Sequence, residues 1–137
     1  MTDVPAAGRS LGWTIGLWVA QVLLAALFLY AGITKATQPP ETLAAMGWDW
    51  ALTLPAAFIV FLGIMEILGA IGIVLPAATR ILPILTPMAA LGMAIVQVSA
   101  MVLHGMRGES IVLNLALLAL ALFVLWGRTR KAPIAGR

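Results

Sequence analysis

Four long segments that are almost free of charged side chains limit the fold of this chain more than any other feature. They cover residues 11–33, 52–75, 81–103 and 111–126, and they contain a single charged residue. A helix needs about 20 apolar residues to cross the hydrocarbon core of a bilayer, and it satisfies its backbone hydrogen bonds internally. The sequence therefore predicts an all-α fold, an integral membrane four-helix bundle that forms a single domain over residues 1–137.

The overall composition excludes several other classes of protein. Hydrophobic residues make up 63% of the chain and charged residues 9%, against about 25% charged residues in an ordinary soluble domain. The chain has no cysteine and one histidine, so the sequence predicts no disulfide, no thiolate site and no metal centre. The pI of about 10.2 does not indicate nucleic-acid binding, because the positive charges lie at the ends of apolar segments and form no basic face.

The connections between these segments predict further elements and an orientation. Pro40 and Glu41 favour a short interfacial helix near residues 40–46, Pro76 is expected to end the second spanning helix, and residues 127–137 form a basic tail that we expect to be mobile. The Lys and Arg residues divide unequally between the two ends of such a bundle. One end carries Arg9, Arg80, Arg128, Arg130, Lys131 and Arg137, and the other carries Lys35 and Arg107. This bias predicts a multi-pass protein of the cell (inner) membrane with both termini in the cytoplasm.

Glu66 is the candidate functional residue with the strongest physical argument. It lies near the middle of its segment, where a carboxylate costs at least about 2.5 kcal/mol, so it is expected to face the bundle interior. A count of 1.5 Å per residue puts Gln21 at a similar depth and Lys35 about 20 Å away. We therefore expect a protonated Glu66 that donates to Gln21 or to a backbone carbonyl. The alternative for Gln21 is a contact with a neighbouring backbone carbonyl. Both a functional role and a purely structural hydrogen bond remain open.

A second group of polar residues is predicted nearer the outer face. Tyr30 and Gln97 come out at similar depths and Asn114 somewhat nearer the inner face, and together with Glu66 and Gln21 they are candidates for a buried polar or ligand site. The candidate charges at the outer mouth are Lys35, His104 and Arg107, and Arg80 is the candidate charge at the inner face. Each also has a simpler interpretation, since Tyr30 is typical of an interfacial aromatic belt and Lys35 of an anchoring lysine. No catalytic residue is predicted.

Several short motifs, in order along the chain, resemble one known family. The first is the run of residues 28–35, which ends in Ala-Gly-Ile-Thr-Lys, and the second is the run of residues 66–76 with Thr79-Arg80 after it. His104 and the pair Gly127-Arg128 follow with matching spacing. Over roughly residues 12–128 the chain resembles DoxX-like membrane proteins. The resemblance implies a four-helix membrane bundle in which Lys35, Glu66 and Arg80 occupy the family's charged positions and His104 matches its DoxX-like branch.

The resemblance leaves three functions open, and whether the chain is an enzyme is open as well. Members of the wider family have been linked to quinone-coupled oxidation, as in thiosulfate:quinone oxidoreductase, to the maturation of other enzymes and to receptor assembly. The chain is therefore expected to be a membrane subunit of a quinone-linked redox system, with the lipid bilayer and a membrane or redox protein as partners. The alternatives are a small transporter that uses Glu66 as a proton or cation switch, and an assembly or scaffold protein.

Overall fold

The computed structural model describes residues 11–137, so Arg9 lies outside the described residues. Within them every regular element is helical. Four helices are long and apolar enough to cross a membrane, which confirms the all-α membrane bundle. In chain order, the elements are α1 (Leu11–Thr37), α2 (Pro40–Ala45), the 3₁₀ helix η1 (Asp49–Thr53), α3 (Ala56–Thr79), α4 (Leu85–Met106), α5 (Val112–Trp126) and the π-helical turn η2 (Gly127–Lys131).

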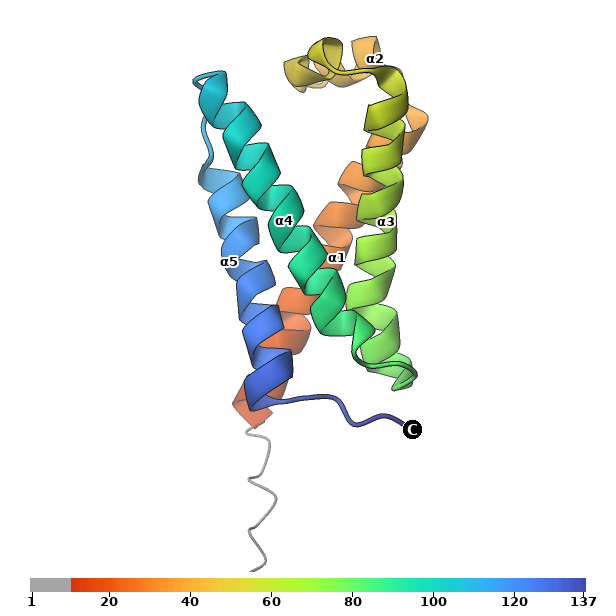
Figure 1. Cartoon of the computed structure of the whole chain (residues 1–137), viewed down its shortest axis with the longest axis vertical. Coiled ribbons are helices and arrows are strands. Elements are labelled where there is room, and N and C mark those ends of the chain that lie inside the picture. The colour runs from red at the N-terminus through yellow and green to blue at the C-terminus, as the bar shows by residue number, and fades with distance from the viewer. Residues whose placement is uncertain (1–10) are drawn as a thin grey trace, which may run out of the picture.

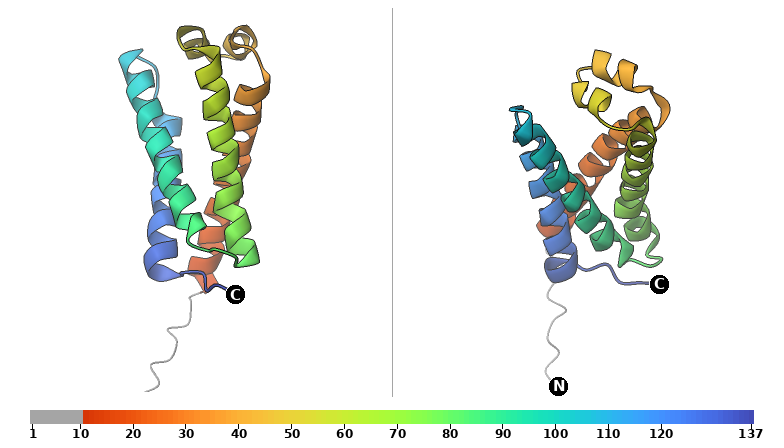
Figure 2. Two further views of the ribbon diagram at one scale, coloured as in Figure 1. Left: turned by 45° about the vertical axis from the view of Figure 1, so that its right-hand side comes forward. Right: turned by 45° about the horizontal axis from the view of Figure 1, so that its top comes forward.

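The four long helices form two closely packed pairs, α1 with α3 and α4 with α5. The pairs meet at one end and spread apart at the other, as Figures 1 and 2 show. We call the end where they meet the base, which also carries the α3–α4 turn and the C-terminus. The opposite end is called the mouth, and it carries α2, η1 and the α4–α5 loop. The bundle is therefore packed at its base and open between the pairs at its mouth.

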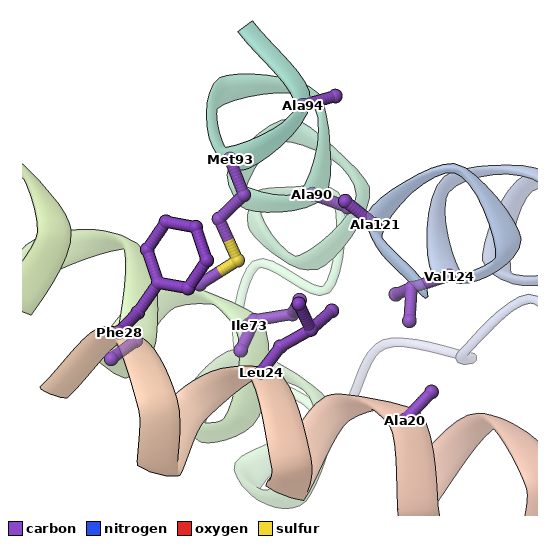
Figure 3. Close-up of a cluster of buried hydrophobic side chains, with 10 residues drawn as sticks. Ala20, Leu24, Phe28, Ile73, Ala90, Met93, Ala94, Ala121 and Val124 are labelled. Atoms are coloured by element: carbon purple, nitrogen blue, oxygen red, sulfur yellow. The ribbon is translucent and has the colours of Figure 1, made fainter. Parts of the chain in front are cut away.

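Small and medium-sized apolar side chains fill the space between the helix pairs towards the base. Leu24 of α1, Ile73 of α3 and Met93 of α4 are almost fully buried and belong to one cluster with Val124 of α5 (Figure 3). Alanines on each of these helices complete the cluster. Small side chains let helix backbones approach closely, and close packing is the main source of helix association in lipid.

The backbones of α1 and α3 approach each other closely where these two helices cross. A Cβ atom on Gly63 would lie 2.6 Å from the carbonyl oxygen of Gly32, and one on Gly32 would lie 2.7 Å from the carbonyl oxygen of Gly63. Neither position has room for a side chain. The crossing therefore sets the register of α1 against α3.

A second apolar cluster lies at the mouth. Leu43, Trp50, Ala51 and Ile59 are buried there, and Leu103 of α4 packs against them. The short helix expected near residues 40–46 is α2, and the η1 helix that follows it was not predicted. Together α2 and η1 lie over the mouth end of α3.

Pro76 does not end the second spanning helix, which continues to Thr79. Proline lacks the N–H that would bind the carbonyl of Gly72, one turn earlier. That carbonyl instead accepts a hydrogen bond of 3.4 Å from the hydroxyl of Thr86 on α4. The next carbonyl, that of Ile73, accepts one of 2.6 Å from Gln21 on α1. The hydroxyl of Thr86 thus satisfies the carbonyl that Pro76 leaves without a backbone donor inside the membrane.

The C-terminal segment differs from the expected mobile tail. The helix continues through η2 to Lys131, and Arg128 is only 6% exposed. Beyond η2, the backbone N–H of Arg137 donates to the carbonyl of Arg80 at 3.0 Å. Lys131 also lies over the rings of Trp13 and Trp126, at 5.8 and 5.3 Å from their centroids. The C-terminal segment is therefore held against the base of the bundle.

Candidate functional site

A cavity of about 610 Å³ lies between the two helix pairs, in the half of the bundle nearer the mouth. Residues of η1 and of all four long helices line it, and most of them are apolar. The polar side chains in its wall are Lys35, Glu66, Gln97, Ser99, His104, Ser110 and Asn114. An apolar chamber with a few polar groups is the usual form of a small-molecule site.

Lys35 and Glu66 form a buried ion pair in the wall of this cavity. The Nζ atom of Lys35 donates to both carboxylate oxygens of Glu66, at 2.7 and 2.9 Å. The two side chains are 11% and 5% exposed. A carboxylate that accepts from one ammonium group at both oxygens has the arrangement of an ionised acid. The pair brings two opposite charges into the membrane with no net charge.

Two tryptophans complete the surroundings of the Lys35 ammonium group. Nζ of Lys35 lies 5.4 Å from the ring centroid of Trp48 and 5.7 Å from that of Trp50. The two indole rings are stacked, with their centroids 6.3 Å apart. Aromatic faces attract a cation electrostatically, more strongly where water is excluded. The sequence did not identify these two tryptophans as part of the site.

The predicted partner of Glu66 was wrong. The depth count separated Lys35 from Glu66 by about 20 Å because it treated the helices as parallel to the membrane normal. In the structure α1 continues to Thr37 and crosses α3 at Gly63, where an added Cβ would lie 3.0 Å from the Cβ of Lys35. Glu66 follows one turn later on α3, within reach of the long lysine side chain. Because the helices are tilted and cross in this register, Lys35 and Glu66 lie within hydrogen-bond distance of each other.

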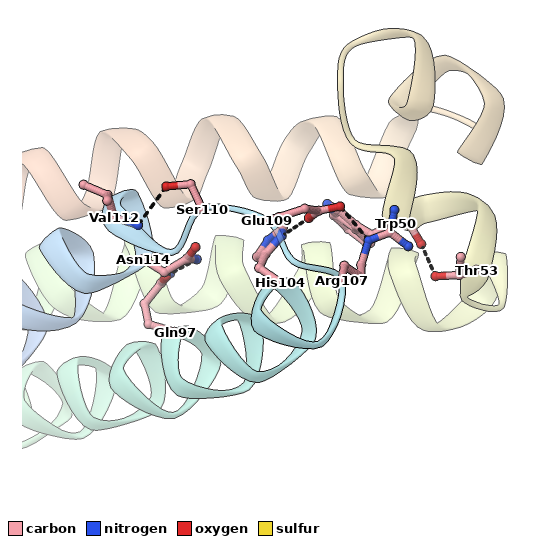
Figure 4. A network of polar contacts seen from close by, with 9 residues as sticks. All are labelled: Trp50, Thr53, Gln97, His104, Arg107, Glu109, Ser110, Val112 and Asn114. Carbon is pink, nitrogen blue, oxygen red and sulfur yellow. Dashed lines mark hydrogen bonds and ion pairs between the residues drawn. The ribbon is translucent and has the colours of Figure 1, made fainter.

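Gln97 of α4 and Asn114 of α5 form a second polar pair in the cavity wall. The side-chain amide of Asn114 donates to Oε1 of Gln97 at 2.9 Å (Figure 4). Gln97 is 5% exposed. The sequence placed both residues in one polar group near the outer face, and the structure brings them together on the helix pair that lies across the cavity from Lys35 and Glu66.

His104, Arg107 and Glu109 form a charged cluster at the α4–α5 end of the mouth. Nδ1 of His104 lies 2.5 Å from Oε2 of Glu109, and Nε of Arg107 donates to Oε1 at 2.6 Å (Figure 4). The hydrogen bond with His104 and then that from Arg107 hold the pKa of Glu109 below its ordinary value. His104 also lines the cavity. The cluster therefore ties the α4–α5 loop to the rim of the cavity.

This cluster predicts how the loop responds to acid. A lowered pKa in the folded state means that the contacts stabilise the loop above the ordinary Glu pKa of about 4.3, and that this contribution is lost as the pH falls through the lower folded-state value. We expect a ¹³C NMR titration of the Glu109 carboxyl to have its midpoint below about 4.3. In the control variant His104→Ala/Arg107→Ala the midpoint should return to the ordinary value. An ordinary midpoint in the wild type would contradict the cluster.

Gln21 belongs to a different polar contact, nearer the base. Its Nε2 donates to the carbonyl of Ile73, and its Oε1 accepts a hydrogen bond of 2.7 Å from Nε of Arg128. Arg128 further donates to the carbonyl of Ala132 and lies over the ring of Trp18. Gln21 is therefore not the partner of Glu66, and its contact with a backbone carbonyl is its alternative interpretation. Pro76 gave no signal for this contact, since the carbonyl that it frees is that of Gly72, which Thr86 binds.

Two other predicted site residues lie away from the cavity. Tyr30 is 59% exposed on the outer surface of α1, which agrees with its alternative interpretation as a residue of the interfacial belt. Arg80 ends α3 at the base in a left-handed conformation, with φ of 59°. Neither contributes to the wall of the cavity. No group of three or more His, Asp or Glu side chains converges anywhere in residues 11–137.

The comparison with protein families gives one match. The model of the DoxX-like family matches residues 19–125, which include all four long helices in whole or in large part and both polar pairs of the cavity. No curated protein and no solved structure shows significant similarity to the chain. The family match covers well over half of the sequence and agrees with the four membrane-spanning helices. The chain belongs to the DoxX-like family.

Proposed function

We propose that the chain is a membrane subunit of a quinone-linked redox system, and that it binds the head group of an isoprenoid quinone in the cavity. The cavity between the helix pairs is the observation that carries this proposal. Its volume of about 610 Å³ lies within the range of roughly 300–1,000 Å³ of small-molecule sites. Its wall combines apolar side chains with polar groups on both helix pairs. A quinone head group is a flat apolar ring with a carbonyl oxygen at each of two opposite edges, so it needs both kinds of contact.

The charges and hydrogen-bond donors of the cavity favour a neutral ligand that accepts hydrogen bonds. Lys35 and Glu66 neutralise each other, so a charged ligand would leave one unpaired charge in the membrane. An ammonium group has three donors and a side-chain amide has two. Glu66 accepts two donors of Lys35, and Gln97 accepts one of Asn114. The remaining N–H groups of Lys35, Asn114 and Gln97 can bind carbonyl oxygens.

In this proposal the residues of the chain bind and orient the quinone and exclude water from its head group. Lys35 would hold one carbonyl oxygen from α1, and the Gln97–Asn114 pair would hold the other from α4 and α5. A bound quinone would supply the two-electron redox chemistry, and a membrane or redox protein would be the partner that exchanges electrons with it. The same binding role is compatible with a chain that has no catalytic activity of its own.

Tryptophan fluorescence tests the binding directly, because Trp48 and Trp50 line the cavity. In nanodiscs, a decyl quinone should quench the fluorescence saturably in the wild type. Gln97→Leu removes the amide that faces the cavity and should weaken binding about fivefold to tenfold, the equivalent of one hydrogen bond of about 1 kcal/mol. The matched control is Val98→Leu, whose side chain is 50% exposed on the outer surface of α4. Equal, unsaturable quenching in all three proteins would contradict the proposal.

We further propose that the base faces the cytoplasm of the cell that carries this protein. Among the described residues the base holds Arg80, Arg128, Arg130, Lys131 and Arg137, and the mouth holds Lys35 and Arg107. An excess of Lys and Arg marks the cytoplasmic side of membrane proteins. A reporter fused after Arg137 should therefore report cytoplasm. A reporter inserted at Gly47, an exposed turn residue with φ of 98°, should report the exterior, and the reverse pattern would contradict this orientation.

Transport is the alternative that would use the same Glu66. In a proton- or cation-coupled transporter, Glu66 would have to exchange Lys35 for the transported cation in each cycle. Proteoliposomes with an imposed pH gradient would then take up cation in the wild type and not in Glu66→Gln. For an assembly or scaffold protein, a membrane protein would instead co-purify in fixed ratio while no quinone is bound.

A further inference from the structure

The cavity is bounded on two flanks by side chains that also reach the outer surface of the bundle. On the flank between α3 and α4, Phe58 and Ile95 line the cavity and are 47% and 59% exposed. On the flank between α1 and α5, Leu27 and Leu113 line it and are 44% and 66% exposed. In a membrane-spanning bundle these surfaces face the hydrocarbon of the bilayer.

The helix packing explains why both flanks are open in the same half of the bundle. Between α3 and α4, a Cβ on Gly72 would lie 3.1 Å from the Cβ of Ala89, towards the base. Where the end of α5 meets α1, a Cβ on Gly127 would collide with the side chain of Leu17, again at the base. Nearer the mouth, α1 runs away from α5 and crosses α3 at Gly63. The pairs consequently diverge towards the mouth (Figure 1).

The route from the aqueous mouth is more obstructed than the two flanks. Trp48 and Trp50 of the mouth cluster line the cavity at this end, and Leu103 packs against that cluster from α4. The loop that follows α4 is tied to the rim by the contacts of Glu109 with His104 and Arg107. A ligand from water would have to pass the rings of Trp48 and Trp50 and the contacts of Glu109. A ligand from the bilayer would pass apolar side chains such as Phe58 and Ile95, and the hydroxyl of Ser99.

We propose that the cavity opens sideways into the bilayer on both flanks, and that its ligand is an amphiphile that enters from the lipid phase and leaves its hydrocarbon tail there. This inference rests on the proposed function for the identity of the head group, which binds between Lys35 and the Gln97–Asn114 pair. On one face of α3, Phe58 is exposed, Leu62 is half-buried and Glu66 is buried, each one turn after the last. Burial therefore increases along this face from the exposed Phe58 to the ion pair.

Single spin labels can distinguish lipid access from water access, because the natural chain contains no cysteine. Nitroxides are attached to Leu62→Cys on α3 and to Leu117→Cys on α5, two half-buried positions in the cavity wall. Leu68→Cys, 55% exposed on α3 outside the cavity, is the lipid reference, and Met106→Cys, 84% exposed at the mouth, is the water reference. Collision rates with oxygen report hydrocarbon, and those with a water-soluble nickel chelate report water.

We expect both cavity labels to collide with oxygen as the Leu68 label does and to be shielded from the nickel chelate, unlike the Met106 label. Nickel collisions at the level of Met106 would overturn the proposal, as would shielding from both reagents. Hydrocarbon access at only one label would overturn the opening on two flanks. If Leu62→Cys fails to fold, Ser99→Cys tests the same flank from α4.

A second stage separates this inference from the proposed function. Adding a long-chain quinone should reduce oxygen collisions at both cavity labels and leave those at Leu68 unchanged. If the labels reach hydrocarbon but the quinone changes nothing, the lateral openings stand and the quinone assignment fails. If the quinone quenches Trp48 and Trp50 while the nickel chelate reaches both labels, the assignment stands and the lateral route fails.

Discussion

Glu66→Gln is expected to lower the free energy of unfolding by about 3 kcal/mol, although glutamine has nearly the shape of glutamate. The substitution leaves the ammonium group of Lys35, whose side chain is 11% exposed, without a counter-ion in the membrane. Removing one partner of a buried pair is costly because the other charge stays desolvated. Unfolding in mixed micelles of increasing denaturing detergent measures the effect for the wild type and the variant.

The matched control is the double variant Lys35→Met/Glu66→Gln, which removes both charges while it keeps similar volumes. It should recover most of the stability that Glu66→Gln loses, because no unpaired charge remains. At pH about 7, the infrared difference spectrum between the wild type and Glu66→Gln should show the loss of one ionised carboxylate. A double variant as unstable as the sum of the two single variants, or a band of protonated acid in the wild type, would contradict the ion pair.

Gly63→Ala is expected to destabilise the protein by about 3 kcal/mol through a single added methyl group. Its Cβ would lie 2.6 Å from the carbonyl oxygen of Gly32 and 2.8 Å from the backbone nitrogen of Ala36. These are backbone atoms of a long helix, so they cannot move aside as the end of a flexible side chain could. The helices must separate, which also lengthens the contact between Lys35 and Glu66.

Gly92→Ala provides the control for this prediction. Gly92 lies within α4, and a Cβ added there would meet no atom within 4 Å. The same change should therefore be neutral, or stabilising by up to about 1 kcal/mol because alanine favours a helix over glycine. Melting temperatures of both variants in the same detergent test the comparison. Equal effects at the two positions would mean that the crossing of α1 and α3 is looser than the structure requires.

Much of the architecture was predictable from the sequence because the membrane imposes simple rules. Apolar length predicted the four spanning helices, and the cost of a charge in lipid predicted that Glu66 faces the interior. Gln97 and Asn114 were predicted as members of one polar group, but the hydrogen bond between them was not predicted. His104 and Arg107 were assigned to the mouth, where the structure has them.

The site itself was less predictable because it depends on how the helices tilt and cross. Counting residues along parallel helices paired Glu66 with Gln21, whereas the structure pairs Glu66 with Lys35 and Gln21 with Arg128. Nothing in the spacing of Trp48 and Trp50 showed that their rings would lie beside the ammonium group of Lys35. Tyr30 has a suitable depth but points away from the cavity.

The sequence alone thus determined which segments enter the membrane and which polar residues must find partners there, because both follow from the free energy of transfer out of water. Only the tertiary structure decided which partners they find. The Gly32–Gly63 crossing sets the register that joins Lys35 to Glu66, and the packing of the base against a spread mouth creates the cavity. Contacts between helices depend on angles and side-chain volumes that are far apart along the chain, and no local pattern encodes them.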